Sequence, residues 1–460
     1  MDYTYIFDPI KDTPSRVQVI DHRLRERYPL QVAVDDEQLL LKSHRTMPAE
    51  IADLIDVAMT VYVADRLSMR KAGMPCDIHI IVPVRHPEIL GSSLLKECLQ
   101  TVLYWYTGDH WSFEFALRTV HGRLTELQMC MPFADPVQPV KVALWSGGLD
   151  SLAGLYNQLL AESTTKYTLF GTGANTFIHS AQRRVAEAVG KKFHGRIKLV
   201  QVPYRLNETK ELAKSSSQRS RGFVFLLLGA ACAYLEGQST LYIYENGIGA
   251  INLPFRESEV GLDHSRSVHP LSLLHMSNLV SHILGRSFVF QNPFLFQTKA
   301  QMCSALAQYN VIDLAFLTIT CDRLHREQPI QCGCCSSCLL RRQALAALGI
   351  EDRTEYLVTS HQAYVRSNRS FDSNHLRAML YQVNILRSLL NSVDPWHSLS
   401  KRYPILQEIA DQVARREALA PVVPVEQLLQ LYKCYILEWD SIQHIIGQGL
   451  LEEDLLQAAV

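Results

Sequence analysis

The chain has 460 residues, 47% of them hydrophobic, and a formal net charge of −1. This is the composition of a globular protein, and the near-neutral charge excludes a general polyanion-binding surface, so nucleic acid is not an expected partner. The N-terminus shows no signal segment, and no run of about eighteen apolar residues predicts a membrane span. Eleven cysteines without a secretion signal indicate reduced thiols or metal ligands, which predicts a cytoplasmic protein.

The first part of the chain, residues 1–135, is predicted to form an accessory α/β domain. Apolar spacing predicts a helix over Ile51–Leu67, and strand patterns cover Asp77–Val84 and Trp111–Leu117. Three prolines then mark a linker at Pro132, Pro136 and Pro139.

Residues 140–348 show alternating strand and helix patterns, which predict a doubly wound, Rossmann-like parallel sheet with helices on both faces. The predicted strands are 141–145, 167–171, 196–202, 240–244, 287–291 and 313–319, and the predicted helices are 151–161, 177–190, 220–236, 268–284 and 298–308. Residues 350–460 lose the strand signals and are predicted to be helical, over His375–Val393, Ile405–Leu419 and Val425–Leu451.

The most informative segment is a strand, 141–145, that stops at Ser146-Gly147-Gly148 before a helix opening at Asp150-Ser151. Two glycines let backbone N–H groups approach an anion, and the helix N-terminus adds unpaired donors, so the loop is predicted to hold phosphate. The serine hydroxyls add donors, and Asp150 is a candidate Mg²⁺ ligand. The alternative is a glycine-rich turn that binds nothing.

A second signal is a cluster of cysteines. Cys332, Cys335 and Cys338 are spaced three apart, and Cys321 lies ten intervening residues upstream. Four thiolates at this spacing can converge on one tetrahedral Zn²⁺ with no open position, which predicts a structural site. Cys334 is left out because its register points it away, and an Fe–S cluster remains the alternative metal centre.

The sequence Ser146–Ser151 resembles the pyrophosphate loop of the PP-loop ATP pyrophosphatases, a group with the Rossmann-like HUP fold. Together with the cysteine signature, it resembles the 7-cyano-7-deazaguanine synthase (QueC) family over roughly residues 140–345. The resemblance implies an enzyme that uses ATP, Mg²⁺ and Zn²⁺ to adenylylate a small-molecule carboxylate, 7-carboxy-7-deazaguanine.

The same resemblance implies roles for individual residues. Ser146, Gly147, Gly148, Asp150 and Ser151 would bind the nucleotide, with Ser146 and Asp150 also counted as catalytic. Three basic residues in family-like segments, Arg219, Arg221 and Lys299, would hold phosphates or the substrate carboxylate, with Arg219 and Lys299 counted as catalytic. For each of these cations a plain salt bridge is the alternative.

Two departures from the family pattern bear on the reaction. The family's Tyr-Gly-Gln-Arg-His segment is replaced by Gly171–Thr176, and its Tyr-Pro-Asp-Cys-Arg loop by Glu245–Phe255. The chain is also longer, and in this it resembles the QueC-like proteins of bacterial antiviral cassettes, the Qat and type IV CBASS systems. That resemblance implies an ATP-dependent ligase forming an amide with an amine, including the N-terminus of a partner protein.

Three other functions remain open from the sequence. The first is a housekeeping-type 7-cyano-7-deazaguanine synthase for queuosine or DNA modification. The second is a tRNA-thiolating or amidating enzyme, which the near-neutral charge disfavours. The third is a non-catalytic ATP-binding scaffold of a defence complex.

Overall fold

The computed structural model describes most of the chain. The described residues are 1–8, 15–43, 47–71, 74–119, 124–127, 140–208, 215, 218–255, 266–322, 330–357 and 374–449. The predicted proline linker therefore lies outside the described residues.

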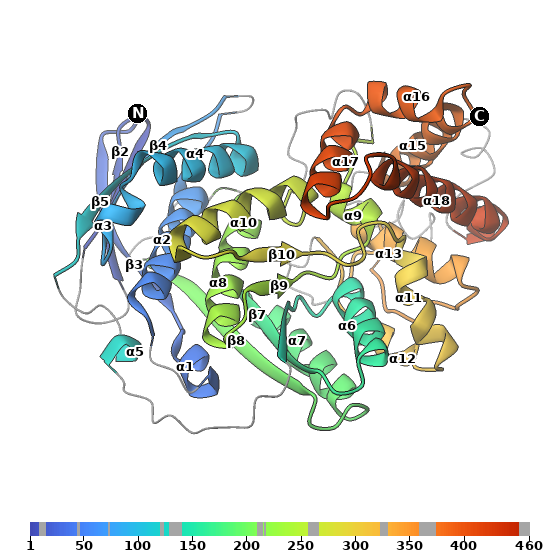
Figure 1. Ribbon diagram of the computed structural model, residues 1–460, viewed down its shortest axis with the longest axis horizontal. Coiled ribbons are helices and arrows are strands. Elements are labelled where there is room, and N and C mark those ends of the chain that lie inside the picture. Colours follow the sequence, from blue (N-terminus) through green and yellow to red (C-terminus); the bar gives the residue numbers. More distant parts are fainter. Residues whose placement is uncertain are drawn as a thin grey trace.

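A single ten-stranded sheet runs through the molecule in the order β10-β9-β6-β7-β8-β3-β2-β1-β4-β5 (Figure 1). The strands are β1 (Tyr3–Phe7), β2 (Ser15–Asp21), β3 (Glu26–Val34), β4 (Asp77–Val84), β5 (His110–Leu117), β6 (Val140–Leu144), β7 (Lys166–Gly173), β8 (Ile197–Glu208), β9 (Thr240–Tyr242) and β10 (Val289–Gln291). All pairings among β6–β10 are parallel, whereas β8–β3, β3–β2 and β2–β1 are antiparallel. The predicted α/β class with a doubly wound parallel sheet is confirmed.

Helices cover this sheet and form a separate group at the C-terminal end of the chain (Figure 1). They are α1 (Glu37–Ser43), α2 (Ala49–Leu67), α3 (Pro87–Leu90), α4 (Ser93–Thr107), α5 (Leu124–Leu127), α6 (Leu149–Ala161), α7 (Thr176–Gly190), α8 (Arg221–Leu235), α9 (Gly247–Ile251), α10 (Pro270–Leu284), α11 (Lys299–Gln308), α12 (Asp313–Phe316), α13 (Ser336–Ala347), α15 (Asn374–Leu390), α16 (Pro395–Arg402), α17 (Ile405–Arg416) and α18 (Val422–Gly449).

One predicted strand is wrong. Residues 313–319 begin with the short helix α12, and the chain then continues without joining the sheet. A short apolar run fits a strand and a buried helical turn equally well, and here the helix buries Leu314 and Ala315.

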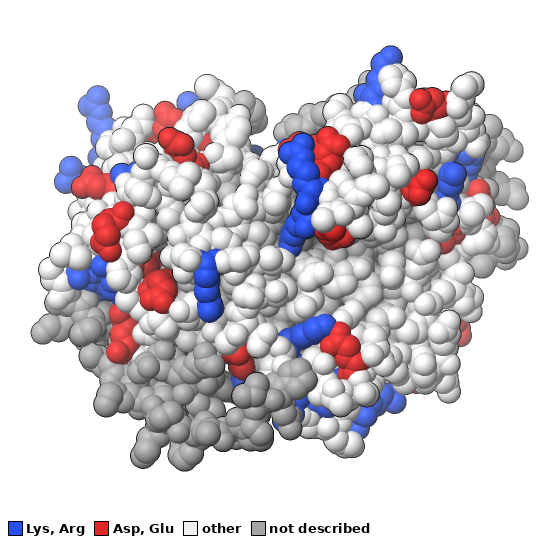
Figure 2. Space-filling model, in the orientation of Figure 1, with Lys and Arg blue, Asp and Glu red and all other residues white. Residues whose placement is uncertain are grey.

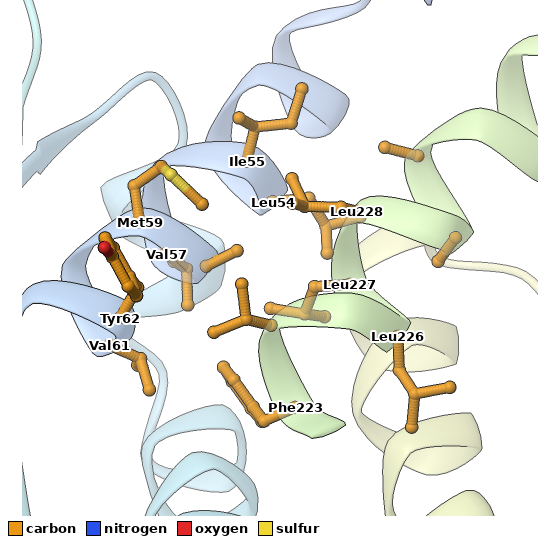
Figure 3. Close-up of a cluster of buried hydrophobic side chains, with 14 of the residues drawn as sticks. Leu54, Ile55, Val57, Met59, Val61, Tyr62, Phe223, Leu226, Leu227 and Leu228 are labelled. Carbon is orange, nitrogen blue, oxygen red and sulfur yellow. The ribbon is translucent and has the colours of Figure 1, made fainter. Parts of the chain in front are cut away.

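A strand pairing and a helix packing are among the contacts that join the N-terminal residues to the rest of the protein. β3 pairs with β8 over five residues, from Leu30–Glu208 to Val34–Tyr204. Helix α2 packs on α8 through buried apolar side chains such as Leu54 and Leu227 (Figure 3). This contact explains why α2 is buried around most of its circumference, and it joins residues 1–135 and 140–348 through one core. The division into domains at these boundaries stays a prediction.

The C-terminal helices α15–α18 form a second hydrophobic cluster around Trp439 and Tyr435. Within the part of the chain that is described, no helix combines the length and apolarity of a membrane span. On the face shown in Figure 2, acidic and basic side chains are interspersed, and neither charge forms a continuous patch.

Candidate functional site

The predicted phosphate loop connects β6 to α6 in a strained turn. Gly147 has φ +73°, and a Cβ there would lie 3.0 Å from the Cα and the nitrogen of Gln182 in α7. Both observations require glycine. The indole nitrogen of Trp145 donates to the carbonyl of Gln182 at 2.9 Å, which fixes α7 against the loop.

The N-terminus of α6 is left without a side-chain cap. Its N-cap residue is Gly148, which has no side chain to accept a hydrogen bond from the first turn. The hydroxyl of Ser146 accepts from the backbone N–H of Gly148 at 3.1 Å and donates to the Ser151 hydroxyl at 3.2 Å. The first N–H groups of a helix have no partner within the helix, so this turn can receive an anion.

A buried charged group lies directly beneath the loop. One oxygen of the Asp150 carboxylate pairs with the Lys299 ammonium at the start of α11, and the other accepts from the Asn246 amide at 2.9 Å. The same amide donates to the Glu245 carboxylate at 2.7 Å. Asp150, Lys299 and Asn246 are buried, at 6%, 3% and 0% exposure, and Glu245 is half-buried.

The environment shifts the protonation of this group. Burial, followed by the neighbouring Asp150 carboxylate, raises the pKa of Glu245 to about 8. Burial opposes the charge on Lys299, but the two carboxylates outweigh it and raise the pKa of its ammonium above the ordinary value. The two carboxyl groups therefore stabilise the Lys299 ammonium, and Glu245 holds its proton more tightly than an ordinary glutamate does.

The two predicted arginines make contacts outside the buried charged group. Arg219 donates to the carbonyl of Thr107, at the end of α4, at 2.7 Å. Arg221 is exposed and lies 5.0 Å from the centre of the Phe225 ring, and a Cβ placed on Gly173 at the end of β7 would lie 3.7 Å from the same ring. The structure thus brings Lys299 to Asp150, while Arg219 contacts the N-terminal region through Thr107. The catalytic role of Arg219 stays a prediction.

The four predicted cysteines come together. The sulfurs of Cys321, Cys332, Cys335 and Cys338 all lie within 4.8 Å of one another, and Cys334 is outside the group. The sulfurs of Cys332 and Cys338 are 3.9 Å apart, and a tetrahedral zinc with Zn–S bonds of ~2.3 Å separates its sulfurs by about 3.8 Å. The donor set therefore fits one Zn²⁺, whereas a multi-iron cluster would hold its cysteines further apart.

The chain leading to Cys321 also forms a wall of the phosphate loop. The backbone N–H of Ile319 donates to the Gly147 carbonyl at 3.2 Å. The buried Arg341 on α13 holds this segment through hydrogen bonds to Thr318 at 2.6 Å and Thr320 at 3.3 Å. The metal site and the loop thus share one structural segment.

Glu245 and Asn246 are functional candidates that the sequence analysis did not single out as site residues. They follow β9, so they lie at the carboxyl edge of the sheet next to the loop. Their sequence signals were their place at the end of a predicted parallel strand, where ligands usually bind, and at the start of the segment that replaces the family's substrate loop.

Comparison with known proteins agrees with this geometry. The family model described as queuosine biosynthesis protein QueC matches residues 140–349. A 7-cyano-7-deazaguanine synthase of Pseudomonas fluorescens (strain Pf0-1) is 30% identical over 234 residues, covering 47% of this chain and 94% of that protein. Proteins with the same description from Pseudomonas aeruginosa (strain LESB58) and Acinetobacter baylyi (strain ATCC 33305 / BD413 / ADP1) are 29% and 24% identical over 238 residues, which is 48% of this chain and 99% and 96% of theirs.

The match spans nearly the whole length of these relatives and includes the phosphate loop, the buried lysine and all four clustered cysteines. The chain therefore belongs to the QueC family.

Proposed function

We propose that this protein is an ATP-dependent ligase that adenylylates a carboxylate of the 7-carboxy-7-deazaguanine type and transfers the acyl group to an amine. The observation that carries the proposal is the uncapped N-terminus of α6 above the buried Asp150–Lys299 pair. Such a site can hold the phosphates of a nucleotide, and the family consists of ATP-using enzymes.

The reaction balances in two steps. A carboxylate oxygen attacks the α-phosphorus of ATP and pyrophosphate leaves, giving an acyl-adenylate. The amine nitrogen then attacks the acyl carbon, AMP leaves, and the nitrogen loses a proton to give the amide. Charge and positioning dominate such chemistry.

The residues of the site have distinct tasks in this proposal. The N–H groups of the loop and the hydroxyls of Ser146 and Ser151 bind pyrophosphate, and Lys299 neutralises negative charge. Arg221, which is exposed near the end of β7, binds a phosphate or the substrate carboxylate at the edge of the site. Asp150 would hold Mg²⁺. The ion would shield the phosphates from the negative charge of the Asp150 and Glu245 carboxylates. The four cysteines would hold Zn²⁺ in a structural role.

For the acceptor we propose the N-terminal amine of a partner protein encoded in the same antiphage defence cassette, of the Qat or type IV CBASS kind. Two observations support a large acceptor. The residues before 140 and after 349 lie outside the family match and add surface around the site. Glu245–Phe255 occupies the place of the family's nitrile-forming substrate loop.

The test begins with ATP–pyrophosphate exchange by the purified chain with 7-carboxy-7-deazaguanine, in which only adenylylation is measured. Proteins encoded beside this gene are then added, and intact-mass spectrometry follows the acceptor. We expect exchange with the carboxylate and a mass increase equal to the acyl group on one neighbour. No exchange and no adduct, with every neighbour present, would contradict the proposal.

A second candidate function is 7-cyano-7-deazaguanine synthesis, which is favoured by the description that the relatives share. It predicts free nitrile from ammonia and two ATP equivalents without any partner. Chromatography of the product from an ammonia-containing reaction distinguishes the two, because the ligase leaves an amide and forms no nitrile.

A further inference from the structure

A glutamate of the C-terminal helix α18 contacts the segment that carries Lys299. One oxygen of the Glu438 carboxylate accepts a hydrogen bond from the hydroxyl of Thr298, and the other accepts from the Gln343 amide of α13 at 3.0 Å. Thr298 and Gln343 are buried, at 0% and 2% exposure. Glu438 thus connects α18 with the start of α11 and with α13, through two partners that are shielded from solvent.

Thr298 is the residue that starts helix α11. Its hydroxyl accepts from the Gln301 backbone at 3.1 Å, and its own N–H donates to the Gln301 side chain at 2.8 Å, so the two form a reciprocal capping box. The next residue is Lys299, whose ammonium pairs with Asp150. Glu438 accepts the remaining hydroxyl proton of the cap and so fixes the orientation of Thr298 immediately before the lysine.

The same helix also supports the other side of the charged group. A Cβ placed on Gly247 would lie 2.7 Å from the side chain of Leu431, which is also on α18. Gly247 directly follows Glu245 and Asn246, and its N–H donates to the carbonyl of Gln297 at 2.8 Å. Helix α18 therefore contacts both segments that build the site.

We propose that Glu438 is a positioning residue, which holds Lys299 at the nucleotide through the cap hydroxyl of Thr298. The inference rests on the proposed function, because it takes Lys299 as a ligand of the nucleotide phosphates. It assigns a task at the site to a helix that lies beyond the family match, which ends at residue 349.

The experiment compares Glu438→Ala with Glu426→Ala, an exposed glutamate on the same helix, in ATP–pyrophosphate exchange and in calorimetric binding of α,β-methylene ATP. We expect Glu438→Ala to raise the KM and the Kd for the nucleotide by ~10-fold, since small displacements of a positioning group have effects of this size or larger. The control should stay at the wild-type value. Equal nucleotide affinity in the two variants would overturn the proposal.

Three further single variants and one double variant separate positioning from folding. Glu438→Gln should keep wild-type affinity, because Gln343 can turn its amide and accept from the new one while Thr298 still donates. Thr298→Val should reproduce the loss, and Thr298→Ser should not. In the Thr298→Val background, Glu438→Ala should have little additional effect on nucleotide affinity, since each substitution already removes the hydrogen bond between Thr298 and Glu438 on which the proposal depends. Additive losses would overturn the proposal.

The outcomes also separate this inference from the proposed function. A wild-type protein that binds the analogue but never exchanges pyrophosphate would contradict adenylylation, and the binding measurements would still decide the role of Glu438. A wild-type protein that binds no nucleotide would contradict both.

Discussion

Two buried charged groups in this protein have similar composition and different surroundings. In the N-terminal region, Arg85 on the chain after β4 pairs with Asp53 at 3.1 Å, with Glu126 at 2.6 Å and with Asp56, while Arg118 reaches Asp56 at 3.2 Å. Beneath the phosphate loop, Lys299 pairs with Asp150, and the Glu245 carboxyl interacts electrostatically with both. Each group contains one carboxylate more than it has cations.

The two groups differ in the interactions that stabilise the carboxylate for which there is no matching cation. Two backbone N–H groups, of Arg85 and His86, donate to the Asp53 carboxylate at 2.8 and 3.0 Å, which adds hydrogen bonds to the N-terminal group. The group beneath the loop adjoins a helix end with no side-chain cap, and its extra carboxylate has a pKa of about 8. Burial raises the pKa of Asp53 too, so a shifted carboxyl is common to both groups. Extensive internal pairing indicates a structural role, and unpaired helix N–H groups beside the carboxyls indicate a binding site.

The largest expected effect is on stability, from breaking the N-terminal group. Replacing Arg85 with Met leaves three carboxylates without their main cation, so we expect the free energy of unfolding to fall by about 3–5 kcal/mol. Chemical denaturation measures this loss, with Arg183→Met, an exposed arginine of α7, as the control. The KM for ATP of the remaining folded protein should not change; a raised KM would mean that the N-terminal group is not purely structural.

The next effect is on activity, from the group beneath the loop. Asp150→Asn should lower pyrophosphate exchange by ~10²–10³-fold, or about 3–4 kcal/mol of transition-state stabilisation. The melting temperature should change less than for Arg85→Met, because loss of the Asp150 charge lowers the pKa of Glu245, which then serves as a charge partner for Lys299. Asp313→Asn, at an exposed ion pair with Arg353, is the control. Retained exchange in Asp150→Asn would favour the non-catalytic scaffold.

The two local motifs were the parts of the site that the sequence could predict. The loop at Ser146–Ser151 and the cysteines from Cys321 to Cys338 carry their chemistry in short stretches, so residue type and spacing were sufficient. Lys299 was singled out through its family-like segment, and the structure brings it to Asp150. Whether it binds nucleotide stays a prediction.

Features that depend on contacts between distant segments could not be predicted. Glu245 gains its unusual environment from Asp150 and Lys299, each far away in sequence. Strand β8 was expected to end at residue 202, but it continues to Glu208 because β3 pairs with its second half. Strand β3 itself gave a weak signal, since Pro29 lies within it and proline disfavours strands.

The smallest expected effect concerns how stability depends on pH. The folded protein holds the Glu245 proton with a pKa of about 8, above the ordinary 4.5, so it binds this proton more tightly than the unfolded chain does. The contribution to stability is complete below pH ~4.5 and is lost as pH rises towards about 8. Glu245→Gln cannot ionise and avoids this loss. Relative to wild type, its stability should therefore rise by about 1–3 kcal/mol between pH 5 and pH 9.

Denaturation curves at several pH values measure this difference, with Glu426→Gln on the surface of α18 as the matched control. Since Asp150 is the main charge that raises the pKa of Glu245 after burial, the gain should shrink in an Asp150→Asn background. A gain that persists unchanged there would show that burial alone sets the protonation of Glu245. In that case the extra carboxylate that both groups contain would not explain the protonation of Glu245, and the two groups would have to be compared by how deeply their carboxyl groups are buried.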